Sequence, residues 1–187
     1  MALRISFELS QKDLDYFCDV MLRVSKNNRG IPQQKVIDSA KQLLTKIHTS
    51  DTSDFVRDRM SQLETLVDML VDEAWGMIDE DRKRVLSALS YFAEPEDLIP
   101  DDTPGLGFID DAIMVEIVCL ALKHEIQAYK EFDAYRSNES SRLGDKAPTL
   151  QKSDWLEERR QQLHSRMRRR RKNDSGARKT KSPFSLL

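Results

Sequence analysis

Five aspartates stand close together in a stretch of the chain that is also rich in proline and glycine. Residues 97–112 read DLIPDDTPGLGFIDDA, and the acids are Asp97, Asp101, Asp102, Asp110 and Asp111. Clustered carboxylate oxygens are the ligands that Mg²⁺ and Ca²⁺ prefer, so a metal-dependent enzyme site is one interpretation. Turn formation and helix capping, which ordinarily use short acidic side chains, are the other, and we expect Asp110 to accept hydrogen bonds from the free amides at the start of the following helix. The stretch lacks the alternating acids and closing glutamate of an EF-hand loop, and we favour the structural interpretation.

The histidines and cysteines of the chain do not stand in a spacing that is typical of a catalytic site. His124 and Glu125 open the sequence HEIQA, which lacks the second histidine of a zinc metalloprotease helix. Cys18 and Cys119 stand among apolar residues and form no CxxC pair, which is typical of buried free thiols. We therefore expect a protein that is not an enzyme and that uses no metal or cofactor.

The strongest signal for a binding partner is the arginine-rich run RMRRRRK at residues 166–172. Residues 166–187 contain nine lysines and arginines against one acid, which gives this segment a charge of +8, whereas residues 1–165 carry −10. Guanidinium groups pair with phosphate oxygens, and counterion release adds affinity without a sequence code. The predicted RNA- or DNA-binding residues are Arg166, Arg168, Arg169, Arg170, Arg171, Lys172, Arg178, Lys179 and Lys181.

Three other uses of this basic segment stay open. Clustered basic residues also attract anionic lipid, so a peripheral membrane protein is an alternative. The segment can be a solvated tail, or the end of a helix that is favoured by its dipole. Because the rest of the chain is acidic, the segment can also fold back on it and be released by a polyanion.

The Asp/Pro/Gly stretch resembles the YkvA-like family, a domain of unknown function. The family hallmark is a DLIPD turn, then a proline and glycine segment that ends in an Asp-Asp pair before a hydrophobic helix. The residues that carry the resemblance are Asp97, Leu98, Ile99, Pro100, Asp101, Pro104, Gly105, Gly107, Asp110 and Asp111. The resemblance implies no known activity. Many members look membrane-associated, but Glu116, Lys123, His124 and Glu125 interrupt the apolar helix of this chain.

Apolar residues at three- and four-residue spacings predict an all-α fold, an irregular bundle of five to six helices. Ser10 with Asp13 predicts a capping box that starts the first helix. Only Glu116 is polar between Ala112 and Leu122, which indicates the central helix of the bundle. The expected helices span about 10–27, 32–47, 54–74, 81–92 and 110–135, with a polar connector over 137–148 and a last helix from 153 or 154.

The two ends of the chain are expected to differ from this body. Residues 3–9 alternate apolar and polar side chains, which predicts a short extended arm that lies along the helices or pairs with a second copy in a homodimer. We expect a helical YkvA-like domain over 1–150, a charged helix over 151–172 whose later turns project from the body, and a flexible, disordered basic tail over 173–187.

No stretch approaches the ~20 apolar residues that cross a bilayer, and the amino terminus is a poor secretory signal, so we expect a cytoplasmic protein. We expect it to act as a helical accessory or regulatory protein that binds a protein or nucleoprotein partner.

Overall fold

The computed structural model describes residues 8–28, 30–93, 98–143 and 154–177. Within these ranges the chain is helical and contains no strand, which confirms the all-α expectation. The described helices are α1 (Gln11–Asn27), α2 (Gln33–His48), α3 (Asp54–Val71), α4 (Asp79–Leu89), the 3₁₀ helix η1 (Ser90–Ala93), α5 (Ile109–Ala121), α6 (Lys123–Leu143) and α7 (Asp154–Ala177).

Polar caps start two of these helices. Ser10 and Asp13 form the predicted capping box at α1, in which the Asp13 carboxylate accepts the Ser10 amide at 2.9 Å. The hydroxyl of Ser53 accepts the Val56 amide at the start of α3. Pro32 directly precedes α2, where its missing N–H costs nothing.

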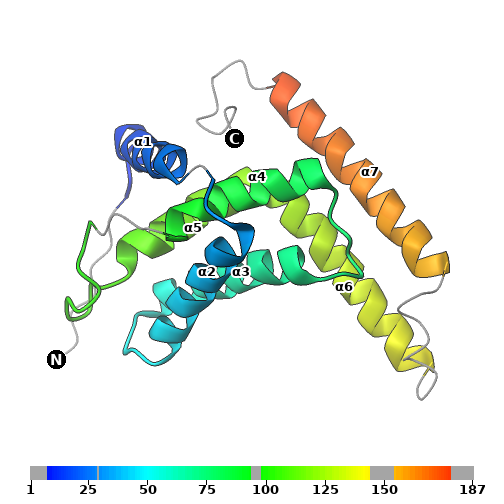
Figure 1. Ribbon diagram of the computed structural model, residues 1–187, viewed down its shortest axis with the longest axis horizontal. Coiled ribbons are helices and arrows are strands. Elements are labelled where there is room, and N and C mark those ends of the chain that lie inside the picture. Colours follow the sequence, from blue (N-terminus) through cyan, green and yellow to red (C-terminus); the bar gives the residue numbers. More distant parts are fainter. Residues whose placement is uncertain (1–7, 29, 94–97, 144–153, 178–187) are drawn as a thin grey trace.

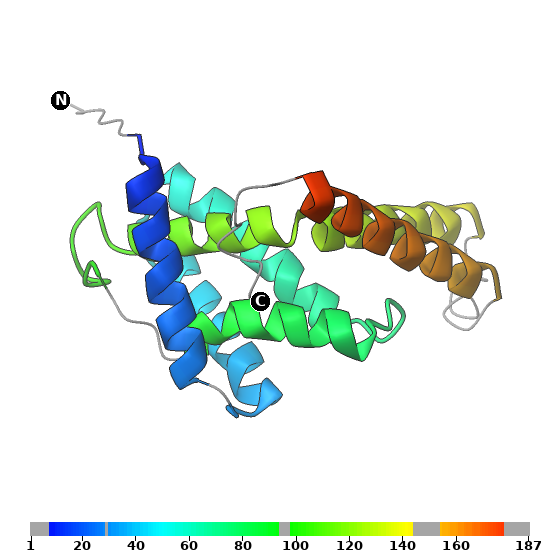
Figure 2. The same ribbon diagram turned by 90° about the horizontal axis from the view of Figure 1, so that it is seen from above.

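Helix α5 is the centre of the bundle, as its apolar run predicts. The side chains of Met114, Val115 and Val118 are fully buried. Helix α3 packs along α5, α2 packs on α3, and α1 also contacts α5. Figures 1 and 2 show α5 passing between α1 on one side and α3 on the other. The motif stretch therefore leads directly into the best-packed helix of the molecule.

The single helix expected over 110–135 is wrong, because the chain changes direction at Leu122. This residue has φ −104° and ψ 19°, outside the α-helical range, and its side chain is buried. After the bend, α6 runs alongside α7, while its residues Tyr129 and Phe132 stay buried in the core. With this split, the described residues form seven α-helices, close to the five to six expected.

The expected connector over 137–148 is wrong as far as Leu143, where α6 ends. Residues of this polar last part of α6 pair with one another, for example Arg142 with Glu139 at 2.7 Å. Such pairs one turn apart support a helix without an apolar stripe.

Helix α7 corrects the prediction that the charged helix projects and then frays. Its residues Leu156, Leu163 and Met167 are buried, and the helix continues to Ala177, past the expected end at residue 172. Figure 1 shows α7 running antiparallel to α6. These three apolar residues are widely spaced among charged residues, so the sequence pattern alone does not reveal that they form one buried stripe.

Three predictions fall outside the described residues in whole or in part. Residues 3–7 of the extended arm and residues 178–187 of the basic tail lie there. Leu9, the last residue of the arm, packs partly buried against the core. The homodimer through the arm stays a prediction.

Candidate functional site

The motif loop, residues 98–108, joins η1 to α5 and is held by one buried carboxylate. Asp110, only 3% exposed, accepts the amides of Leu98 at 2.8 Å and Ile99 at 3.0 Å through Oδ2. The expectation that Asp110 caps its own helix is wrong, because it lies inside the first turn of α5. The residue at the N-cap is Phe108, with a left-handed φ of 64°. Asp110 thus ties the start of the loop to the start of the helix.

Glycine is required at two points of this loop. Gly105 has φ +74°, a backbone conformation that other residues adopt at a cost. A Cβ added to Gly107 would lie 2.1 Å from the backbone oxygen of Asp101. The carbonyl of Pro100 accepts the Thr103 amide at 2.9 Å and closes the first turn. Pro104, the second motif proline, is exposed on the same loop.

The remaining motif acids point to different surroundings. Asp101 pairs with Lys46 of α2 at 3.3 Å, Asp102 is exposed, and Asp111 is buried. Asp97 lies outside the described residues. Within the described part of the chain, no three His, Cys, Asp or Glu side chains are grouped so that they could hold a metal ion.

The arginine-rich run lies on α7 and is divided between two environments. Arg166 pairs with Glu131 of α6, and Arg171 reaches into the body, so these two guanidinium groups face inward. Arg169, Arg170 and Lys172 are exposed. Arg168 is half-buried, and Arg178, Lys179 and Lys181 lie outside the described residues.

We call Asp81, Arg84, Glu125 and Arg171 the buried ion-pair cluster. It joins α4, α6 and α7. Asp81 and Glu125 are each only 1% exposed. The Nη1 of Arg171 donates to Asp81 Oδ1 at 2.6 Å and to Glu125 Oε1 at 2.9 Å. Arg84 Nε lies 3.4 Å from the same oxygen of Glu125. Burial disfavours the charged form of Arg171, but its hydrogen bonds to the two carboxylates and their negative charges outweigh that penalty and raise its pKa.

This cluster was missed at the level of sequence, although a signal exists. Asp81 stands four residues before Val85 and eight before Leu89, on the apolar stripe of α4. Glu125 occupies the same kind of position before Phe132 on α6. An isolated acid on an apolar stripe predicts a buried carboxylate that needs a cation from elsewhere in the fold.

A second contact between α7 and the body is aromatic. The ring of His164 stacks on Trp75 with centroids 4.1 Å apart and an interplanar angle of 21°. Its Nε2 lies 3.2 Å from the Trp75 backbone oxygen, while Nδ1 is buried and has no hydrogen-bond partner among the described residues. Burial lowers the pKa of His164.

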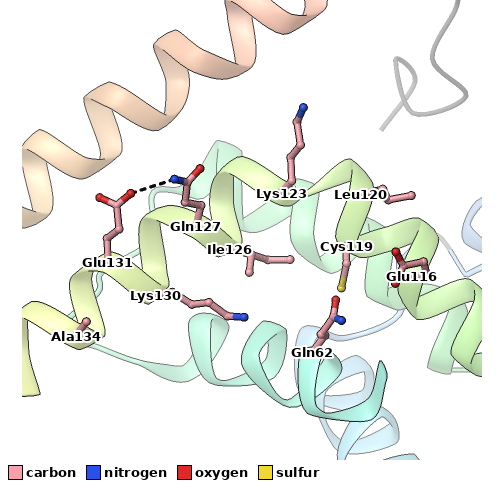
Figure 3. Close-up of a pocket in the computed structure, with 10 residues that line it drawn as sticks. All are labelled: Gln62, Glu116, Cys119, Leu120, Lys123, Ile126, Gln127, Lys130, Glu131 and Ala134. Atoms are coloured by element: carbon pink, nitrogen blue, oxygen red, sulfur yellow. Dashed lines mark hydrogen bonds between the residues drawn. The ribbon is translucent and has the colours of Figure 1, made fainter. Parts of the chain in front are cut away.

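An open groove lies where α5 meets α6, with α3 as its floor (Figure 3). Its volume is about 530 Å³, and Leu120, one of its lining residues, is 60% exposed. The lining residues are Gln62, Glu116, Cys119, Leu120, Lys123, Ile126, Gln127, Lys130, Glu131 and Ala134. Burial raises the pKa of the Cys119 thiol to about 12, so this cysteine is a poor nucleophile.

Comparison with known proteins identifies the family to which the region around the motif loop belongs. A family model described as "Protein of unknown function (DUF1232)" matches residues 82–117, which run from α4 through the loop into α5. The "Uncharacterized membrane protein YkvA" of Bacillus subtilis (strain 168) is 33% identical over 79 residues, which span 39% of this chain and 73% of that protein. The chain belongs to the YkvA-like family.

Membership of the YkvA-like family confirms the resemblance that the motif indicated, and the family description assigns no activity. No solved structure is significantly similar to the chain. Of the described helices of this YkvA-like protein, none combines the length and the apolar content that crossing a bilayer takes.

Proposed function

We propose that this YkvA-like protein is a non-enzymatic binding protein that docks on an anionic membrane surface through the outward face of α7. The observation that carries the proposal is the exposed row of Arg169, Arg170 and Lys172, for which the described residues provide no ion pair. Basic side chains near an anionic leaflet contribute about 1 kcal/mol each. Three such side chains on one helix therefore contribute about 3 kcal/mol to membrane binding.

A membrane is preferred to a nucleic acid because of the similarity to the Bacillus protein, whose name describes a membrane protein. The structure also reduces the number of available cations, since Arg166 and Arg171 pair with acids of the body. A surface contact of three charges suits a broad, weakly specific anionic surface.

RNA or DNA is the second candidate. It is favoured by the arginines at 168–170, because a planar guanidinium binds a phosphodiester through two hydrogen bonds. Under this alternative the salt dependence of binding reflects about three or four phosphate contacts, fewer than the nine basic residues of the segment suggest. The protein or nucleoprotein partner stays a prediction.

The test compares the full chain with the triple variant R169Q/R170Q/K172Q in co-sedimentation with vesicles. The vesicles contain phosphatidylcholine alone or with 30% phosphatidylglycerol, at three salt concentrations. Losing about 3 kcal/mol at low salt lowers the partition coefficient by about two orders of magnitude. A matched control, K12Q/K41Q/K83Q, removes three exposed lysines from other helices and should bind like the unmodified chain.

The outcomes separate the candidates. Equal binding by both triple variants would refute the role of α7. Absence of vesicle binding at low salt, together with salt-sensitive fluorescence anisotropy on labelled RNA or DNA, would replace the membrane by the nucleic acid. Truncation after Ser165 is unsuitable as a test, because it removes the buried Met167 and Arg171 from the core.

A further inference from the structure

The groove at the α5–α6 junction lies beside the basic face of α7. Two ion pairs give the register of the antiparallel helices: Arg166 pairs with Glu131, and Asp174 pairs with Lys123 at 2.5 Å. Glu131 and Lys123 both line the groove. Arg170 is four residues from Arg166 and from Asp174, so it lies on the stripe of α7 that faces α6, where that stripe borders the exposed basic face. Figure 3 shows α7 on the side of α6 that lies away from Gln62 of α3.

The acids of the groove are already neutralised by arginines. Glu116 pairs with Arg59 at 2.5 Å, and Glu131 pairs with Arg166. Lys130 lines the groove, is exposed and has no ion pair among the described residues. With Arg170 at the edge, the rim of the groove therefore carries an excess of positive charge.

Part of the groove lining is apolar. Leu120 is 60% exposed, and the partly buried Ile126 also lines the groove. The buried Cys119 adds a further apolar surface. An exposed leucine in a groove that also carries cationic side chains combines the two contacts that an anionic phospholipid offers, an acyl chain and a phosphate.

We infer that this groove is a phospholipid-binding site, in which Leu120 and Ile126 contact the acyl region while Arg170 and Lys130 contact the phosphate. The inference rests on the proposed function, because it places the membrane on one face of the molecule. It adds an apolar component to a contact that would otherwise be electrostatic and fully reversed by salt.

The experiment uses the full chain and vesicles with 30% phosphatidylglycerol. L120N should weaken binding at least fivefold with an unchanged salt dependence, because no charge is altered. L106N is the matched control, since Leu106 is 51% exposed on the motif loop, and it should change binding less than twofold. In L120W, the added emission relative to the unmodified chain should be quenched by lipids brominated in the acyl chain.

Each other result overturns the inference. If the unmodified chain ignores the vesicles, the proposed function itself fails. If the chain binds but L120N binds equally well and L120W is not quenched, only the groove assignment fails. If L120N instead converts a dimer to a monomer in analytical ultracentrifugation without changing vesicle binding, a second copy of the chain covers the groove.

Discussion

Replacing Arg171 by methionine tests whether α7 is an integral part of the body. The methionine keeps the apolar stem but removes the guanidinium that lies between Asp81 and Glu125. Glu125 keeps Arg84 at 3.4 Å, whereas Asp81 loses the only cation that the described residues give it. One buried carboxylate is then left without a counter-charge.

The magnitude follows from the burial of that carboxylate. Asp81 is 1% exposed, and breaking a buried ion pair by removing one partner costs about 3–5 kcal/mol. Because Glu125 keeps a partner, we expect the lower end, about 3 kcal/mol. In a chain of 187 residues this loss lowers Tm by roughly 6–12 °C.

Urea unfolding followed by circular dichroism at 222 nm measures the change in the free energy of unfolding. R170M is the matched control, because Arg170 is exposed one position earlier on the same helix, and it should change stability by less than about 0.5 kcal/mol. Adding D81N to R171M should recover part of the loss, since the stranded charge is removed. The reasoning is refuted if R171M and R170M are equally stable.

Three further perturbations test other parts of the structure. G107A should destabilise the fold more than G105A in urea unfolding. A Cβ at position 107 would lie 2.1 Å from a backbone oxygen. Position 105 has open space, so an alanine there costs only the strain of its left-handed φ of +74°, about 1–2 kcal/mol. The pKa of His164 in the folded state is below its ordinary value of 6.5, so the unfolded state binds the proton more readily and stability falls as pH drops below about 6.5. The free energy of unfolding of H164F should therefore depend less on pH in this range. The same pH dependence in both proteins would contradict the burial argument. Cys18 and Cys119, whose pKa values burial raises to about 11 and about 12, should resist iodoacetamide at pH 8 in the folded protein and react once urea unfolds it, as mass spectrometry would show.

Local signals were sufficient for much of the fold. The all-α class, the capping box of Ser10 and Asp13, and the central position of the apolar helix after the motif follow from residues close together in the chain. The motif residues also identified the YkvA-like family. These features depend on helical periodicity and on hydrogen bonds between near neighbours, which a sequence displays directly.

The divided roles of the arginine-rich run were decided only by tertiary structure. By sequence, Arg170 and Arg171 are adjacent residues of one charged run, yet the first is exposed and the second lies between two buried carboxylates. The same holds for Asp110, whose hydrogen bonds go to the loop before it instead of to its own helix. A side chain's partner depends on which helix packs opposite, and the bend at Leu122 that brings α6 against α7 is set by packing between segments far apart in the chain.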